Sequence, residues 1–294
     1  GVHRIVIDSF DEIDRLETIG AEVDVLVRIT PGVEAHTHEF IATGHDDTKF
    51  GFTVSTGDAK RAVDRVRASD VLRFRGVHCH IGSQVFRLAS FADAARIVAR
   101  MVKEYEPEEV SIGGGLGVAY LVGEEAPTMQ EWADAVHGAF EAEGVEAKVT
   151  AEPGRSIVAQ AAITVYTVGT IKDIEGVRTY VAVDGGMSDN PRPVLYGSGY
   201  ETFLPRAVAE DRKKAVRVVG KHCESGDLLV RQGWVPSDLA VGDLLATPVT
   251  GAYGHTMGSN YNKVLRPPVV FVSNGESRLV VRRETYGDLL HLEN

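Results

Sequence analysis

An acidic and a basic side chain lie three positions apart in "EPGR", residues 152–155, directly after the strand-like run 145–150. A carboxylate such as Glu152 can hold a protonated ring nitrogen, and a guanidinium such as Arg155 can grip a carboxylate or a phosphate. The same spacing also suits a salt bridge between these two side chains. Both interpretations stay open at this point.

A second candidate motif is "HCHIGSQ", residues 78–84, which carries two histidines and also lies at the end of an apolar run. His80 stands at the end of an apolar run, where an imidazole can stack on a flat cofactor while Ser83 reaches a phosphate. The alternative is a buried, hydrogen-bonded histidine. His78 and His80 fall on the same side of a strand, but no pair of Cys or His elsewhere completes the spacing of a zinc site. We therefore expect no metal.

Glycines follow another apolar run in "GGGLG", residues 113–117. Glycines after a strand let backbone N–H groups close on a phosphate, helped by the N-terminus of a following helix. The dinucleotide-binding fingerprint is excluded because Val118 stands where G-x-G-x-x-G needs its last glycine. A tight turn between strand and helix explains the same residues equally well.

The second half of the chain adds further candidates. Cys223 in "CESGD" is flanked by polar residues and glycine, so it is a poor core residue and a plausible proton donor. Arg192 and Tyr196 are one helical turn apart and could share a carboxylate, although a surface arginine is the alternative. Tyr253 in "GAYG" lies between small residues, which leave its side chain room to face a ligand.

The elements that position the first motifs alternate between strands and helices. We predict strands at about 4–8, 23–30, 74–80, 109–113 and 148–152, separated by four helical patterns with capping residues such as Ser9 and Thr128. Such alternation predicts a parallel sheet. The polar motifs lie on the loops after the strands, which favours a (β/α)8 barrel, although a doubly wound sheet alternates in the same way. Five strands would be about strands four to eight of that barrel, with three more upstream of Gly1.

After about residue 159 the pattern changes to short β-type runs broken by turn residues, and Asn274-Gly275 is a strong hairpin signal. The predicted fold class is therefore α/β plus all-β. Residues 1–159 form a partial barrel, and residues 160–294 form a β-sandwich or barrel-like domain.

Composition narrows the function. The net charge of -11 argues against a nucleic-acid surface, and no apolar run approaches the roughly 20 residues that span a bilayer. Two cysteines make no disulfide framework, so we expect a cytoplasmic protein acting on a small molecule. The chain starts with Gly1 and a strand-like run, and we expect it to be cut from a longer protein.

Taken in order, "HIGSQ", "GGGLG", "EPGR", "CESGD" and "GAYG" resemble the fold-type III decarboxylases that depend on pyridoxal 5'-phosphate (PLP). "KHCESGD", "DGGMSDN" and "RRET" point to the diaminopimelate decarboxylase family within them. That family joins an alanine-racemase-like barrel to a β domain and converts meso-diaminopimelate to L-lysine. The resemblance runs along nearly the whole chain.

The resemblance implies a role for each motif. His80 would stack on the pyridine ring, Ser83 and the glycine amides would bind the phosphate, and Glu152 would keep the pyridine nitrogen protonated. The implied cofactor-binding residues are His80, Ser83, Gly113, Gly114, Gly115, Glu152, Arg155 and Tyr253. Cys223 would be the catalytic acid that protonates the carbanion. The implied substrate-binding residues are Arg155, Arg192 and Tyr196 for the distal carboxylate, Glu224 for the distal ammonium, and Tyr253.

The family also implies a homodimer in which the "CESGD" loop reaches the neighbouring active site. Lys49 resembles a lysine that relatives pair with an acid across that interface, here Asp227. One departure is serious, because the family's Schiff-base lysine lies in a Tyr-Ala-x-Lys-Ala-like first strand and no such motif is present. We expect the chain as given to be an N-terminally truncated and inactive piece.

Two alternatives remain. Decarboxylases of ornithine, arginine or carboxynorspermidine share the cofactor motifs, but ornithine would leave the groups for a distal carboxylate unpaired. A non-catalytic protein that kept the fold should also have lost Cys223, Glu152 or the glycines, and all are present. An alanine racemase would need a catalytic tyrosine in place of "CESGD".

Overall fold

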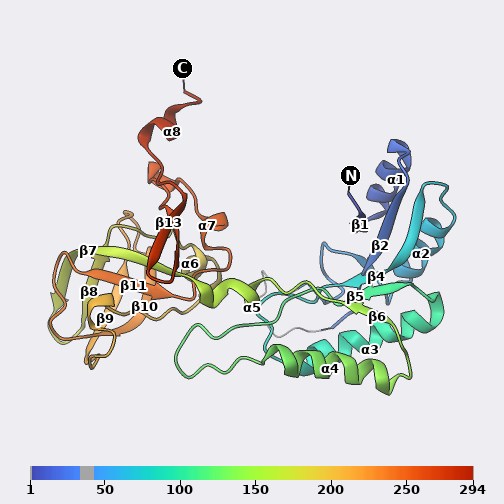
Figure 1. Ribbon diagram of the computed structural model, residues 1–294, viewed down its shortest axis with the longest axis horizontal. Coiled ribbons are helices and arrows are strands. Elements are labelled where there is room, and N and C mark those ends of the chain that lie inside the picture. The colour runs from blue at the N-terminus through green and yellow to red at the C-terminus, as the bar shows by residue number, and fades with distance from the viewer. Residues whose placement is uncertain (1, 34–42, 294) are drawn as a thin grey trace. The chain divides into compact units, whose positions relative to one another are not determined.

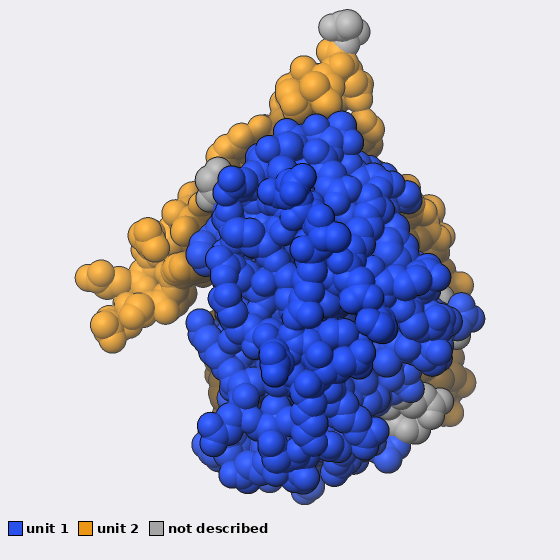
Figure 2. Space-filling view, turned by 90° about the vertical axis from the view of Figure 1, so that its right-hand side faces the viewer, with its two compact units in different colours: residues 1–118, 125–157 blue, residues 119–124, 158–294 orange. Residues whose placement is uncertain are grey.

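The computed structural model describes residues 2–33 and 43–293. The chain forms two compact units, distinguished by colour in Figure 2. The first, which we call the barrel unit, comprises Gly1–Val118 and Glu125–Ile157. The second, the β unit, comprises Ala119–Glu124 and Val158–Asn294. The short segment 119–124 thus belongs with the β unit although barrel-unit residues flank it.

The barrel unit contains one curled parallel sheet. Its strand order is β1 (Arg4–Ile7), β2 (Val23–Thr30), β4 (Leu72–Cys79), β5 (Glu109–Ser111) and β6 (Lys148–Thr150), with the two-residue β3 (Phe52–Thr53) paired to β2. The five predicted strands are confirmed, whereas β3 was not predicted. Successive strands are added in one direction without reversal, as in a barrel; a doubly wound sheet would reverse at a switch point. The partial barrel is therefore confirmed.

Four helices pack against this sheet: α1 (Phe10–Ile19), α2 (Asp58–Arg67), α3 (Leu88–Tyr105) and α4 (Met129–Ala142). Figure 1 shows α3 and α4 side by side. The predicted caps are present, since Ser9 accepts the amide of Glu12 and Thr128 forms a reciprocal capping box with Glu131. Within the described residues, no helix combines the length and the apolar character that crossing a membrane requires.

The β unit is built on a five-stranded sheet. Its order is β10 (Leu228–Val235), β9 (Lys214–Val219), β8 (Arg178–Val183), β7 (Ile163–Ile174) and β11 (Leu244–Pro248). A separate hairpin joins β12 (Val269–Ser273) to β13 (Glu276–Val281) through Asn274 and Gly275, both with positive φ, which confirms the predicted turn. The short helix α5 (Arg155–Val158) begins in the barrel unit and ends in the β unit. The other short helices are η2 (Ala159–Ala161), α6 (Arg192–Tyr196), η3 (Pro205–Ala207), α7 (Gly254–Met257), η4 (Tyr261–Lys263) and α8 (Tyr286–Leu290).

Candidate active site

Three loops of the barrel unit are joined to one another at the carboxyl ends of β4, β5 and β6. The side chain of Gln84 donates to the carbonyl of Val118 at 2.7 Å and accepts the amide of Val118 at 3.2 Å. The amide of Glu152 donates to the carbonyl of Gly113 at 2.8 Å. The "HIGSQ", "GGGLG" and "EPGR" motifs therefore lie together, at the end of the sheet where parallel barrels carry their chemistry.

The three glycines at 113–115 are required by this packing. A Cβ on Gly113 would collide with the carbonyl oxygen of Cys79, and one on Gly115 with that of Gly82. Gly113 and Gly115 also have φ of 68° and 107°, which side chains disfavour. The tight-turn interpretation of these glycines is thus sufficient to explain them, and phosphate binding stays a prediction.

The amides of this turn are only partly available for a phosphate. The amide of Gly113 donates to Ser111 Oγ at 3.1 Å, and that of Gly114 donates to His80 Nδ1 at 3.1 Å. In the described part of the chain, no acceptor lies against the amide of Gly115. The amide of Gly115 is therefore the one of the three that most readily suits a phosphate, and phosphate binding by Ser83 and the amides of Gly113, Gly114 and Gly115 stays a prediction.

Glu152 is held by two side chains that sequence reasoning did not assign to it. His78 Nε2 lies 3.2 Å from both carboxylate oxygens, and the hydroxyl of Ser111 donates to one of them at 2.7 Å. The hydrogen bond from His78, followed by that from Ser111, lowers the pKa of Glu152 to about 2, against the opposing effect of burial. Arg155 instead donates to Ser83 Oγ at 3.0 Å. The acid and base of "EPGR" are thus directed to different partners.

His80 is a neutral imidazole with a fixed orientation. Burial, followed by the electrostatic effect of Arg28 and of the neighbouring His78, lowers its pKa to about 4. Because Nδ1 accepts the amide of Gly114, the ring proton lies on Nε2. A neutral ring with a fixed plane suits stacking against a flat aromatic group.

In the β unit, Arg192 is buried between two tyrosines. It is 3% exposed, its Nη2 donates to Ser198 Oγ at 3.2 Å, and its guanidinium carbon lies 5.2 Å and 5.3 Å from the ring centroids of Tyr120 and Tyr196. Among the described residues, no carboxylate forms an ion pair with it. A buried guanidinium without a counterion is costly, so this arrangement favours an external anion. The sequence did not predict Tyr120 as a neighbour of Arg192, because Tyr120 lies shortly after "GGGLG" and far from Arg192 along the chain.

The "CESGD" loop is anchored by its own aspartate. Asp227 is 2% exposed and accepts the amides of Met187 at 2.6 Å and His222 at 2.9 Å. The carboxylate thus holds its own loop together, and the expected pairing of Lys49 with Asp227 across a dimer interface stays a prediction. The same contacts join "KHCESGD" to "DGGMSDN".

The two cysteines differ in availability. Cys79 is fully buried, and burial raises the pKa of its thiol to about 12. Cys223 is exposed on the anchored loop. Only Cys223 is therefore suited to exchange a proton with a ligand, as its position predicts.

Two further predicted residues of the β unit are Glu224, which follows Cys223, and Tyr253. The hydroxyl of Tyr261, which was not predicted, donates to Glu224 Oε1 at 2.6 Å. Tyr253 is 48% exposed and has a φ of 65°, unusual for a tyrosine. Among the described residues, no cluster of three His, Cys, Asp or Glu side chains has the arrangement of a metal site.

Comparison with known proteins assigns the family. A family profile described as "Pyridoxal-dependent decarboxylase, pyridoxal binding domain" matches residues 1–159. The diaminopimelate decarboxylase of Mycobacterium tuberculosis strain H37Rv is 48% identical over an alignment that covers 100% of this chain and 71% of that protein. The chain belongs to the diaminopimelate decarboxylase family. The family member from Bacillus subtilis strain 168 is 44% identical, with 98% of this chain and 69% of that protein covered.

Solved structures of diaminopimelate decarboxylases share the fold. The M. jannaschii enzyme in co-complex with L-lysine superimposes with a TM-score of 0.89 at 33% identity, covering 99% of this chain and 69% of that one. The Helicobacter pylori enzyme complexed with L-lysine gives a TM-score of 0.87 at 30% identity, covering 98% and 72%.

The family's cofactor, PLP, fits the residues of the barrel unit. Glu152 is an ionised carboxylate with one side toward solvent, which suits a protonated pyridine nitrogen. The neutral ring of His80 suits the aromatic face, and Ser83 with the Gly115 amide offers donors for a phosphate. These residues therefore match the ring nitrogen, the ring face and the phosphate of this cofactor.

Proposed function

We propose that this protein decarboxylates meso-2,6-diaminopimelate to L-lysine and carbon dioxide with PLP as cofactor, a carboxy-lyase reaction of lysine biosynthesis. One observation carries the choice of substrate. Arg192 is buried in an aromatic cage without a carboxylate partner among the described residues. A substrate that keeps a second carboxylate at its far end would supply that partner.

The barrel unit would hold the cofactor. Glu152 keeps the pyridine nitrogen protonated, His80 covers the ring face, and Ser83 and the Gly115 amide hold the phosphate, with Gly113 and Gly114 shaping the turn. Arg155, which donates to Ser83, would lie at the phosphate and the substrate carboxylate. When bound, PLP supplies an electron sink for the pair left by carbon dioxide.

The β unit would select the substrate and complete the reaction. Arg192 and Tyr196 would bind the distal carboxylate, and Glu224 the distal ammonium. Ornithine has no distal carboxylate and would leave Arg192 buried and unpaired, at a cost of about 1–3 kcal/mol or more. Cys223 would deliver a proton to the substrate carbon after decarboxylation, and Tyr253 would contact the substrate and cofactor.

Substrate turnover tests this proposal. The protein with its native N-terminus, loaded with PLP, should release L-lysine and carbon dioxide from meso-diaminopimelate. We expect kcat/KM for ornithine to be at least about 100-fold lower, because Arg192 would lose its partner. Equal turnover of ornithine, or no release of lysine, would reject the proposed substrate.

We further propose a cytoplasmic homodimer with shared active sites, in which the loop of Cys223 serves the neighbouring copy. The exposure of Cys223 on an anchored loop supports this arrangement. Mixing Glu152→Ala protein with Cys223→Ala protein, under conditions that exchange subunits, tests it. If sites are shared, about a quarter of the activity should return, because half of the dimers are mixed and each has one intact site. Inactive mixtures would show that each site is built from one chain.

A further inference from the structure

Glu224 has one neutral hydrogen-bond donor on its carboxylate. The hydroxyl of Tyr261 donates to Oε1 at 2.6 Å, which is short for an O–H···O bond and typical of a charged acceptor. Among the described residues, no lysine, arginine or histidine forms an ion pair with Glu224. The phenol therefore orients the carboxylate without adding a positive charge to it, and among the described residues no hydrogen bond occupies Oε2.

Tyr261 is itself fixed in place. Its ring lies against that of His222, with centroids 5.4 Å apart, and the Nε2 of His222 lies 3.0 Å from Ser188 Oγ. Glu224, with which the hydroxyl of Tyr261 bonds, is two residues beyond His222. The tyrosine therefore contacts the "CESGD" loop at two points, through its ring and through its hydroxyl.

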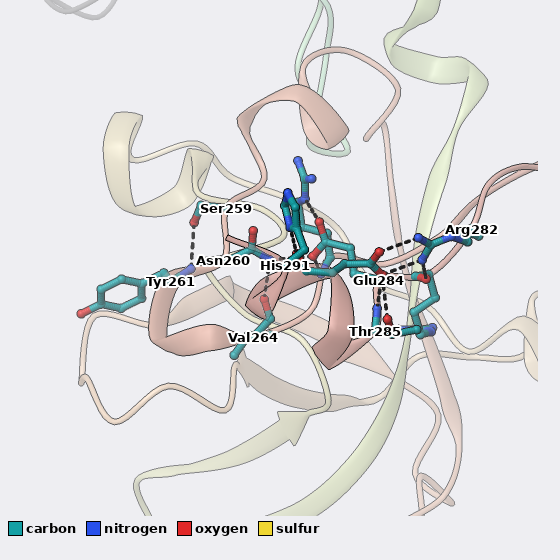
Figure 3. Close-up of polar contacts among 11 residues, drawn as sticks. Ser259, Asn260, Tyr261, Val264, Arg282, Glu284, Thr285 and His291 are labelled. Atoms are coloured by element: carbon teal, nitrogen blue, oxygen red, sulfur yellow. Dashed lines mark hydrogen bonds and ion pairs between the residues drawn. The ribbon is translucent and has the colours of Figure 1, made fainter. Parts of the chain in front are cut away.

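The loop that carries Tyr261 is braced from the C-terminal segment. Figure 3 shows Glu284, which accepts Asn260 Nδ2 at 2.6 Å and also binds the amide and Nε of Arg266 at 2.8 Å and 2.6 Å. Between these anchors, Asn262 and Lys263 hold left-handed φ angles of 52° and 59°. Such conformations cost about 1–2 kcal/mol each and persist where surrounding contacts over-determine them. Glu284 belongs to the "RRET" motif, so this motif holds Asn260, the residue directly before Tyr261.

We propose that Tyr261 is a positioning residue that fixes the carboxylate of Glu224 to receive the distal ammonium of the substrate, and that it thereby contributes to substrate specificity. The proposal rests on the function proposed above. A glutamate side chain free to rotate loses entropy when it binds an ammonium, and a carboxylate already held by a phenol loses less. A phenol suits this task because it donates a hydrogen bond and carries no charge to compete with the ammonium.

The test compares two ligands that differ in the distal amine. The Tyr261→Phe variant of the native-length, PLP-loaded protein is assayed for the KM of meso-diaminopimelate and for the inhibition constant of 2-aminopimelate, which keeps the distal carboxylate and lacks that amine. We expect KM to rise about tenfold, as loss of a hydrogen bond to a charged group implies, with kcat changed less than KM. The inhibition constant of 2-aminopimelate should not change. The Tyr286→Phe variant, altered at an exposed tyrosine, is the matched control and should leave both constants unchanged.

Two results would overturn the positioning role. Equal weakening of both ligands would mean that Tyr261 only supports the fold of the loop, and an unchanged KM would mean that it does not orient Glu224. The Glu224→Gln variant separates this inference from the function beneath it. If Glu224→Gln weakens only the diaminopimelate and Tyr261→Phe weakens neither ligand, the inference alone fails. If Glu224→Gln weakens the binding of neither ligand, Glu224 does not bind the distal ammonium. The positioning role of Tyr261 and the proposed substrate role of Glu224 are then both rejected.

Coupling between the two residues gives an independent check. The KM of the Tyr261→Phe, Glu224→Gln double variant should exceed that of Glu224→Gln alone by less than about twofold. The reason is that the phenol acts through the carboxylate, which Glu224→Gln has already removed. A full additional tenfold rise would contradict that mechanism.

Discussion

The candidate residues of the barrel unit bind one another, whereas those of the β unit retain groups that the unit itself does not satisfy. Glu152 has two internal partners and a depressed pKa, and the backbone around Gly115 leaves no room for a side chain. In the β unit, Arg192 has no carboxylate partner among the described residues, and the "CESGD" loop has open space around Gly226. Under the proposed function, the first arrangement suits a prearranged cofactor site, and the second suits groups that wait for a substrate to pair with them.

A pair of glycine substitutions tests this contrast with the largest expected effect. Gly115→Ala places a Cβ against the carbonyl of Gly82 at a φ of 107°, and should lower the free energy of unfolding by about 3 kcal/mol or more, or prevent folding. Gly226→Ala, with no atom within 4 Å of the new Cβ, should change it by less than about 0.5 kcal/mol. Urea unfolding of the native-length protein measures both. Similar losses in the two variants would remove the distinction between a tightly and an openly packed site.

The neutral state of His80 should appear as a pH dependence of stability. The pKa of His80 is about 4 in the folded protein and about 6.5 in the unfolded chain. Between these two pH values the unfolded chain therefore binds a proton that the folded protein does not bind. The contribution of neutral His80 to the free energy of unfolding is therefore fully present above pH 6.5 and is lost as the pH falls toward 4. Lowering the pH from 7 to 5 should therefore reduce the free energy of unfolding by about 2 kcal/mol through His80.

The His80→Asn variant should lack this component, and urea unfolding at pH 7 and pH 5 measures the difference. His137→Asn, which alters an exposed histidine, is the control and should behave like the parent. If His80→Asn loses as much stability as the parent on acidification, His80 is not held neutral by the folded protein.

The partners of Glu152 offer a smaller but more specific test. His78→Phe removes the leading cause of the lowered pKa of Glu152, so this pKa should rise from about 2 toward the ordinary range. Because the carboxylate would then hold the pyridine nitrogen less well, we expect kcat to fall about tenfold. The carboxyl-carbon resonance of Glu152, assigned by difference from Glu152→Gln, follows the titration, and His137→Phe serves as control. An unshifted resonance would assign the low pKa of Glu152 to its other side-chain partner, Ser111, instead.

Local signals in the sequence were sufficient for most of the fold. The five barrel strands, the caps at Ser9 and Thr128, and the Asn274-Gly275 hairpin each depend on neighbours in sequence, and all are confirmed. β3 has two residues, too few to show a period, and was missed. Its pairing with β2 comes from the fold and not from a local pattern.

Sequence could not supply the partners of the candidate site residues. His78 and Ser111 support Glu152 because β4 and β5 pair in a register that sets them side by side, next to Arg28 of β2. Register of this kind is a tertiary property. Tyr120 and Tyr261 are likewise far in sequence from Arg192 and Glu224, so their contacts had no local signal.

The division of labour between the two units is the central claim, and one variant tests it most directly. In Arg192→Gln of the native-length protein, the dissociation constant of PLP is measured beside kcat/KM for meso-diaminopimelate, with exposed Arg231→Gln as control. We predict an unchanged PLP dissociation constant and a loss in kcat/KM on the order of 100-fold, as expected when a buried charge pair loses one partner. If PLP binding weakens as much as kcat/KM falls, or if kcat/KM does not change, Arg192 is not the anion receptor for the substrate and the account is wrong.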